Sequence, residues 1–372
     1  MGKGKTISLS SIAISSFEHS FPFAFYRLPG SKFIKVIAQK SASLPKLRSK
    51  DNYANQKGFL FAPFYKSKKA YTVLIKPDIF LQTKITPPEV SLSKKIENKK
   101  SKADNLSITD KADYISLVEK IVKQIGQEKF IKVVAARVLR TSKPVTFDAE
   151  LFFRAVCHKY PNSFVSLVYT PAFGLWIGAS PEILLRHDGS AFKTYALAGT
   201  KSNVKGKSQR DFGKKEKMEQ EIVTEFVSKA IRKVSKIPPV ITGPTVIDTG
   251  NLLHLRTAFS FSKPTKTKWQ KIVKELHPTP AVAGSPKKRA LSFIKKHEKE
   301  DRDFYCGYLG PVNIDGEINL YVNLRCMKVL DSILKIYVGC GITEGSIALE
   351  EWNETLIKSQ TLLSVLKSQE IG

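Results

Sequence analysis

Two stretches of the chain, 164–200 and 310–343, place one β-rich run after another with only short turns between them. Asp188-Gly189 and Asp315-Gly316 are turn dipeptides typical of antiparallel strand pairs. Helical patterns occur around these stretches, but they do not follow every strand. Because a parallel sheet needs regular β–α alternation, this order favours an α+β fold built on antiparallel sheets.

The remaining elements are expected from their local patterns. A hairpin is predicted over 22–39 around Pro29-Gly30, with further strands in 58–81 and at 130–137. Asp110 is a good N-cap for an amphipathic helix that ends near Gly126. Further helices are predicted at about 146–159, 211–235, 286–298 and 349–368.

The domain organisation follows from a change in composition. Residues 1–110 are predicted to be a β-rich part of the same domain as the rest, and 111–372 to be the region that carries the site. A polar connection is expected near 82–110, where Pro87-Pro88, serines and many lysines occur together.

The charge of the chain is strongly positive. Lys plus Arg number 61 and Asp plus Glu 33 among 372 residues, for a net charge of +28. The basic residues are spread along the chain, and no basic-aromatic RNA motif or Cys/His finger is found. We therefore expect a lysine-rich surface that favours solubility and anionic small substrates, with no nucleic acid and no membrane as partner. Four scattered cysteines fit reduced thiols in a cytoplasmic protein.

Lys132 stands out because it interrupts an apolar strand. Apolar residues occupy both faces of the run 130–137, which indicates a central strand and an inward-facing amine. Burial disfavours the charged form of an amine and makes a base available. The alternative is an edge strand whose lysine reaches solvent.

Several other polar residues occupy positions where function and ordinary structure are both possible. Glu219 lies beside the apolar stripe of its helix. It is interpreted either as a boundary glutamate paired with a nearby lysine or as a metal ligand. Glu182 begins a strand directly after Ser180-Pro181, where a turn-edge salt bridge is the ordinary interpretation. Glu354 and Lys358 form a helical i,i+4 pair, which by itself indicates an exposed ion pair. Arg325 lies on a polar strand face, while Gly339 and Gly341 either expose backbone N–H groups to an anion or ease a bend.

Taken together, ordered segments of the chain resemble the chorismate-utilising enzymes, closest to the isochorismate synthases of menaquinone and siderophore pathways. The resemblance covers about 130–366, whereas the first 110 residues match only loosely. The matching segments are IKVVAAR (131–137), GASPEILLR (178–186), LAGTK (197–201), MEQEIV (218–223), LLHLRTAF (252–259), HPTPAVAG (277–284), DRDFYCGYLG (301–310), LRCMK (324–328), VGCGIT (338–343) and EEWNETLIK (350–358).

The resemblance implies a fold and a cofactor. The fold would be two large packed antiparallel β-sheets flanked by helices, with 111–372 as the chorismate-binding catalytic region. The cofactor would be Mg²⁺, held by Glu219 and Glu354. Two carboxylates together with a substrate carboxylate suit this hard cation.

The resemblance also implies a reaction. In having lysine at position 132 the chain resembles the isochorismate and salicylate synthases, which use water. Anthranilate synthases typically carry glutamine at this position. Lys132 would take a proton from water that attacks C2 of chorismate, and Glu182 would protonate the departing C4 hydroxyl. The expected activity is that of an isochorismate synthase in menaquinone biosynthesis, with a siderophore-pathway or salicylate synthase as the alternative.

The family pattern supplies the remaining substrate contacts. Chorismate would be held by Gly199, His254, Ala281, Tyr305, Arg325, Gly339, Gly341 and Lys358. Arginine offers a fork to one carboxylate and lysine a point charge, while the glycines offer backbone N–H groups. We expect a monomer or a homodimer. A more distant alternative is a basic nucleic-acid-binding protein on the same scaffold.

Overall fold

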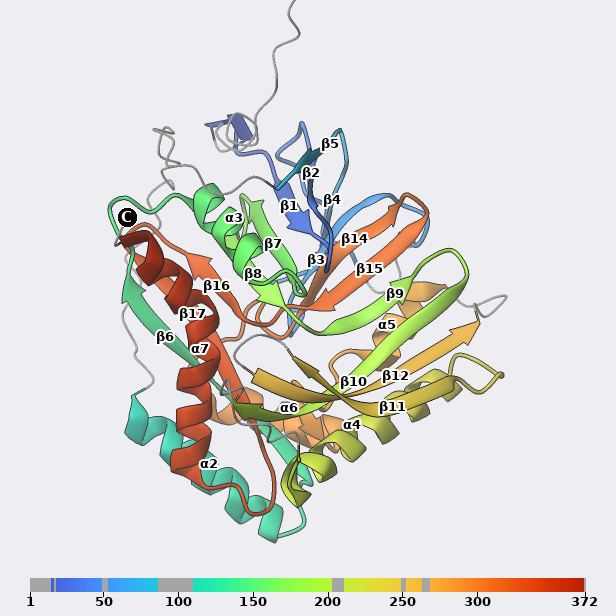
Figure 1. Cartoon of the computed structure of the whole chain (residues 1–372), viewed down its shortest axis with the longest axis vertical. Coiled ribbons are helices and arrows are strands. Elements are labelled where there is room, and N and C mark those ends of the chain that lie inside the picture. The colour runs from blue at the N-terminus through green and yellow to red at the C-terminus, as the bar shows by residue number, and fades with distance from the viewer. Residues whose placement is uncertain are drawn as a thin grey trace, which may run out of the picture.

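The computed structural model describes residues 15–16, 18–48, 53–85, 110–202, 211–248, 252–262 and 268–370. Within these residues the chain forms two antiparallel sheets, one of nine strands and one of eight, with helices around them (Figure 1). This architecture confirms the predicted α+β fold of two large sheets.

The nine-stranded sheet has the strand order β13-β6-β17-β16-β8-β7-β1-β2-β5. Its members are β1 (Phe23–Arg27), β2 (Phe33–Ala38), β5 (Ile79–Lys84), β6 (Lys132–Ser142), β7 (Phe164–Thr170), β8 (Gly174–Ser180), β13 (Gly284–Ser285), β16 (Cys326–Val329) and β17 (Ile333–Ile342).

The eight-stranded sheet has the order β11-β12-β10-β9-β15-β14-β3-β4. Its members are β3 (Gly58–Ala62), β4 (Val73–Ile75), β9 (Ile183–His187), β10 (Ala191–Ser202), β11 (Val240–Asp248), β12 (Leu252–Ser262), β14 (Tyr308–Ile314) and β15 (Glu317–Val322).

The helices lie mostly where amphipathic patterns predict them. They are α2 (Lys111–Gly126), α3 (Ala149–Lys159), α4 (Lys214–Arg232), α5 (Trp269–Leu276), α6 (Lys287–His297) and α7 (Ala348–Glu370). Asp110 caps α2 as predicted, since its Oδ1 accepts a hydrogen bond from the backbone N–H of Asp113 at 2.7 Å. The short helix α5 and the hairpin of β11 and β12 were not predicted.

Apolar side chains fill two layers. The larger layer lies between the two sheets, where the rings of Phe164 in β7 and Tyr321 in β15 stack with centroids 4.1 Å apart. The second layer lies on the other face of the nine-stranded sheet, beneath α3 and α7. There Phe153 of α3 meets Phe25 of β1 edge-on. Both faces of this sheet are therefore buried, which explains its nearly continuous apolar strands.

The structure corrects the interpretation of both stretches as simple meanders. β7 pairs with β8 in one sheet, but β9, which begins three residues after Ser180, pairs with β10 and β15 in the other. The chain crosses back between β15 and β16. The two crossovers are joined, because Ser180 Oγ donates to Val322 O at 2.5 Å and Val322 N donates to Glu182 O at 2.9 Å.

The N-terminal strands are built into both sheets. β1 pairs with β7, and β3 pairs with β14. The predicted polar connection begins too early, since residues 82–84 belong to β5, which pairs with β2. The rest of that connection, 86–109, lies outside the described residues.

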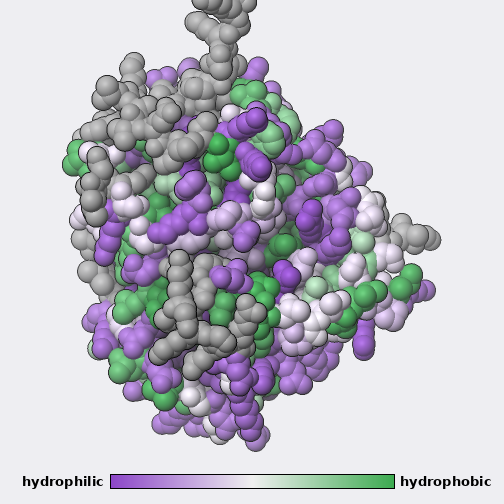
Figure 2. Space-filling view, viewed as in Figure 1, coloured by the Kyte–Doolittle hydropathy of each residue, from purple (hydrophilic) through white to green (hydrophobic). Residues whose placement is uncertain are grey.

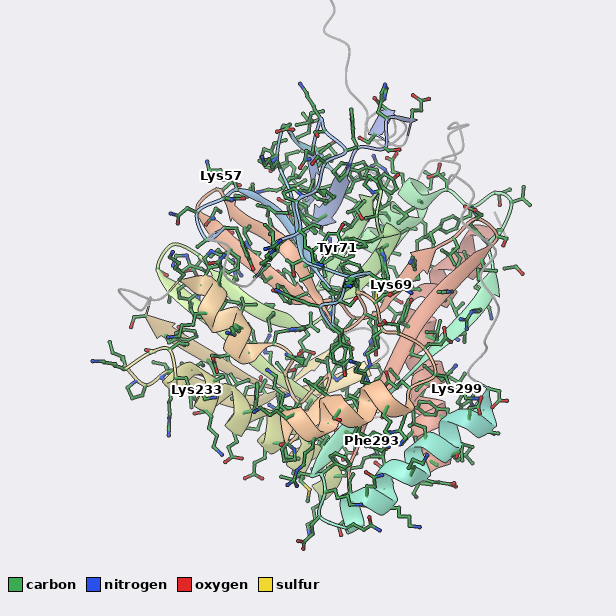
Figure 3. The ribbon with its side chains drawn as sticks, turned by 180° about the vertical axis from the view of Figure 1, so that it is seen from behind. Lys57, Lys69, Tyr71, Lys233, Phe293 and Lys299 are labelled. Atoms are coloured by element: carbon green, nitrogen blue, oxygen red, sulfur yellow. The ribbon has the colours of Figure 1, made fainter. Side chains whose placement is uncertain are left out.

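Hydrophilic side chains cover the surface broadly. Figure 2 shows them across the visible face, with hydrophobic side chains in small groups between them. From behind, the labelled Lys57, Lys233 and Lys299 lie far apart around the molecule, and α6, marked by Phe293, crosses the lower part of this face (Figure 3). Within the described part of the chain, no helix has the length and hydrophobicity needed to cross a membrane.

Candidate active site

A cavity of about 80 Å³ lies where the two crossovers meet the helices α4 and α7. Every site residue expected from the sequence contributes to its wall, including both residues expected to transfer protons. The predicted residues that line it are Lys132, Glu182, Gly199, Glu219, His254, Ala281, Tyr305, Arg325, Gly339, Gly341, Glu354 and Lys358.

Lys132 lies at the start of β6 and points into this cavity. Strands β13 and β17 pair with β6 on its two sides, so the alternative of an edge strand is wrong at this position. The lysine is 2% exposed, and its Nζ lies 3.5 Å from Glu219 Oε2. Glu219 is thus paired with a lysine, but with a buried one that shares its cavity.

Gly341 makes room for the Lys132 side chain. A Cβ at position 341 would lie 2.6 Å from Lys132 Cε and 2.9 Å from Nζ, closer than atoms can approach. At Gly339 a Cβ would lie 2.8 Å from the carbonyl oxygen of Ala135 and 3.0 Å from the hydroxyl of Tyr305. The two glycines therefore have a steric reason that the sequence did not reveal, in addition to any role of their N–H groups.

Glu182 occupies the first crossover, immediately after Pro181. It is 4% exposed and has no ion-pair partner among the described residues, so it is not the turn-edge salt bridge that the strand start alone would favour. Burial raises the pKa of this carboxyl to about 8, while Lys132 and Thr279 act in the opposite direction. The carboxyl is therefore largely protonated at neutral pH and is suited to donate a proton.

His254 of β12 faces Gly199 of β10 across a bulge. Gly199 has φ +68°, a conformation that favours glycine, and its carbonyl oxygen lies 3.2 Å from His254 Nδ1. Burial, with Arg325 and Lys358 nearby, lowers the pKa of His254 to about 3, so the ring is neutral. Its Nε2 is buried and has no hydrogen-bond partner among the described residues. That nitrogen can bond a ligand in the cavity.

Two cations hold the other end of the cavity. Arg325 lies in the second crossover with φ +48°, and its guanidinium donates to Thr361 Oγ1 at 3.2 Å. Lys358 Nζ lies 2.5 Å from Glu354 Oε1 and donates to Gly339 O at 2.9 Å. The i,i+4 pair on α7 is therefore part of the cavity wall rather than an exposed helix pair.

The carboxylates of α4 and α7 are suitable ligands for a hard cation. Glu219 and Glu354 both line the cavity. Burial alone would raise the pKa of Glu354, but the adjacent Lys358 ammonium holds it below its ordinary value, so this carboxylate is ionised. Carboxylate oxygens in a partly polar cavity fit Mg²⁺.

Ala281 and Tyr305 come from loops rather than from strands. Arg302 holds the loop that carries Ala281 against strand β6. The Arg302 guanidinium donates to Val282 O at 2.6 Å and to Val134 O at 2.8 Å. Glu298, buried beside it, forms an ion pair at 2.5 Å with Arg302. The loop 277–284 is thereby tied to the strand that carries Lys132.

Sequence reasoning missed three residues around the site. Arg302 lies within the segment DRDFYCGYLG and follows Glu298 by four residues, but the sequence does not show that its guanidinium also bonds the distant carbonyls of Val282 and Val134. Glu351 and Lys215 form an ion pair at 2.5 Å between α7 and α4. Their signal was present but unused, since Glu351 precedes Glu354 by three residues and Lys215 precedes Glu219 by four, so each shares a helix face with a predicted metal ligand.

Known proteins resemble this chain in sequence over most of its length. Isochorismate synthase EntC of Escherichia coli strain K12 is 29% identical over 266 residues, which cover 70% of this chain and 68% of that protein. Isochorismate synthase MenF of Bacillus subtilis strain 168 is 27% identical over 264 residues, which cover 69% of this chain and 56% of that protein.

Solved structures share the fold over nearly the whole chain. A putative 2,3-dihydroxybenzoate-specific isochorismate synthase, DhbC from Bacillus anthracis, has a TM-score of 0.78 at 23% identity, over 97% of this chain and 100% of that one. MenF, the menaquinone-specific isochorismate synthase from Escherichia coli, has a TM-score of 0.75 at 21% identity, over 98% and 93%. The sequence model described as chorismate binding enzyme matches residues 21–367, and the chain therefore belongs to this family of chorismate-binding enzymes.

Proposed function

We propose that the protein is an isochorismate synthase, which converts chorismate to isochorismate by adding water at C2 and releasing the C4 hydroxyl. The observation that carries this proposal is that Lys132 and Glu182 line one buried cavity and form no ion pair with each other. Such a pair of titratable groups in different environments suits one base and one acid.

The proton transfers follow from these two environments. Lys132 accepts a proton from the water that attacks C2. Glu182 donates its proton to the C4 hydroxyl, which leaves as water while the ring double bonds shift. One water enters and one leaves, so the product is an isomer of the substrate. The pKa of about 8 at Glu182 supports its role as the proton donor.

The rest of the cavity supplies binding groups for an anionic ring. Arg325 and Lys358 offer positive charge to the carboxylates of chorismate, aided by the backbone around Gly199, Gly339 and Gly341. The unpartnered Nε2 of His254 is available to accept a hydrogen bond from a substrate hydroxyl. Ala281 and Tyr305 shape the wall between them.

Glu219 and Glu354 are proposed to hold Mg²⁺. When bound, the cation would orient the ring carboxylate and offset its negative charge. The two glutamates come from different helices, so the cation would also join α4 to α7. Lys132 lies 3.5 Å from Glu219, which places the proposed base beside the metal ligand.

One related activity and one other pathway are the alternatives. A salicylate synthase would start with the same water addition and then eliminate pyruvate, and Lys132 and Glu182 suit both enzymes. For the pathway we propose menaquinone biosynthesis, with siderophore biosynthesis as the alternative, and for the location the cytoplasm. The monomer or homodimer stays a prediction.

The test is a product assay with purified protein, chorismate and Mg²⁺, resolved by liquid chromatography. The proposal expects isochorismate to form without pyruvate. Salicylate together with an equal amount of pyruvate would replace it by the salicylate synthase. No turnover, combined with salt-sensitive binding of DNA or RNA, would favour the basic nucleic-acid-binding protein instead.

A further inference from the structure

A third carboxylate lies behind the two proposed metal ligands. Glu351 is 1% exposed and precedes Glu354 by one turn of α7. One carboxylate oxygen of Glu351, one of Glu354 and the Sγ of Cys340 all lie within 4.8 Å of one another. Ser346 Oγ donates to Glu351 Oε1 at 2.7 Å. Glu351 is therefore within a short side-chain movement of any cation that Glu354 holds.

Lys215 holds this third carboxylate from the opposite helix. Its Nζ donates to the same Oε1 of Glu351 at 2.5 Å. The Glu351 side chain is 1% exposed and the Lys215 side chain 30%, so the pair is screened less than a surface pair. Lys215 lies one turn before Glu219 on α4, as Glu351 lies one turn before Glu354 on α7, so the ion pair joins the two helices beside the proposed ligands.

The number of carboxylates around a cation decides what else can bind to it. Two carboxylates neutralise the charge of Mg²⁺ and leave coordination positions for water and substrate. A third would make the centre negative, occupy one of those positions and repel an anionic substrate. A site that must accept a substrate carboxylate therefore gains from keeping its third glutamate away from the metal.

We propose that Lys215 is a positioning residue that keeps Glu351 from ligating Mg²⁺ and so reserves a coordination position for a carboxylate of the substrate. This inference rests on the proposed function. The competing explanation is that Lys215 only links α4 to α7. In that case its removal would lower stability without changing how the protein binds Mg²⁺.

The test is calorimetric titration of Mg²⁺ into the full-length protein without chorismate. In Lys215→Met the freed Glu351 joins the other two carboxylates, so we expect Mg²⁺ to bind roughly tenfold more tightly than in the wild type. At saturating Mg²⁺ the KM for chorismate should rise, by several-fold, with a smaller change in kcat. The double variant Lys215→Met/Glu351→Gln, which leaves no unpaired buried charge, should return both quantities to near the wild-type values.

A matched control removes the same charge from the same helix. Lys229 of α4 pairs with Glu225 at 2.6 Å on the surface, and Lys229→Met should change neither Mg²⁺ affinity nor KM. Unchanged or weaker Mg²⁺ binding in Lys215→Met, or a double variant that stays as tight as the single one, would overturn the inference. If the wild type itself binds no Mg²⁺, the metal assignment fails and this inference fails with it. That outcome is distinct from a failure at Lys215 alone.

Discussion

The two groups proposed to transfer protons are held in one cavity by opposite means. Lys132 lies on a strand that is paired on both sides, and its amine has a carboxylate partner, Glu219, at 3.5 Å. Glu182 lies in a two-residue crossover between sheets and has no ion-pair partner in the described part of the chain. A pairing interaction sets the first environment, and burial sets the second.

This difference shows how one cavity can keep an acid and a base apart. An acid that lacks a partner stays protonated because burial penalises its charge, whereas an amine beside a carboxylate keeps a positioned, hydrogen-bonding head group. Had both groups shared one ion pair with each other, neither would be available to the substrate. Glu182 is therefore free of an ion pair with Lys132, and burial outweighs the effects of Lys132 and Thr279 on its carboxyl.

The largest expected effect is from removing the amine. Lys132→Ala should lower kcat by roughly 10⁴, the upper end of what a positioned base contributes. The fold should persist, because the strand keeps its backbone partners. Steady-state rates and a circular dichroism spectrum of the same preparation provide the check. Near-wild-type turnover in a folded variant would remove Lys132 as the base.

Removing the acid should be somewhat less damaging. Glu182→Gln keeps the volume of the side chain and a hydrogen-bond donor, but it has no proton to release. We expect kcat to fall by roughly 10²–10³ while the KM for chorismate changes little. A variant that loses binding but keeps its rate would mean that Glu182 holds the substrate rather than protonating it.

Removing the partner of Lys132 should act through the metal. Glu219→Ala deletes a proposed ligand. Loss of a residue that only orients a metal ligand typically lowers metal affinity by roughly 10–100-fold, so Mg²⁺ affinity should fall by at least this much. Calorimetry with Mg²⁺ alone measures this without relying on turnover. If the affinity stays as in the wild type, Glu219 serves only as the counter-ion of Lys132.

The smallest effect is a gradual dependence on pH. Glu182 must be protonated to donate, and its pKa is raised to about 8 by burial. Activity that depends on this proton is present below that pH and falls above it, by about tenfold for each further unit. A profile of kcat/KM for the wild type should show this limb, and Glu182→Gln should lack it.

Much of the fold could be predicted from sequence, for local reasons. The cap at Asp110 and the hairpin at Pro29-Gly30 depend on neighbouring residues, and both formed as expected. Sheet membership could not be predicted, because alternation of apolar residues shows which face a side chain takes but not which sheet its strand joins. The crossovers at Glu182 and Arg325, where the chain passes from one sheet to the other, could therefore not be predicted.

The site divides in a similar way. Family motifs placed Lys132, Glu182, Glu219 and Glu354 without any knowledge of their distances. The reason for Gly341, which is the space taken by Lys132, emerged only in three dimensions. Lys215 and Glu351 are 136 positions apart. Helical spacing places each on the same face as a predicted metal ligand, but it does not show that the two side chains meet.

Isotope labelling tests the central claim most directly. Wild-type protein would be incubated with chorismate and Mg²⁺ in H₂¹⁸O, and the product examined by mass spectrometry and NMR. If Lys132 activates water for attack at C2 while Glu182 releases the C4 hydroxyl, isochorismate should carry one ¹⁸O, located on its C2 hydroxyl. Isochorismate without the label, or with the label at another carbon, would contradict water addition across this cavity.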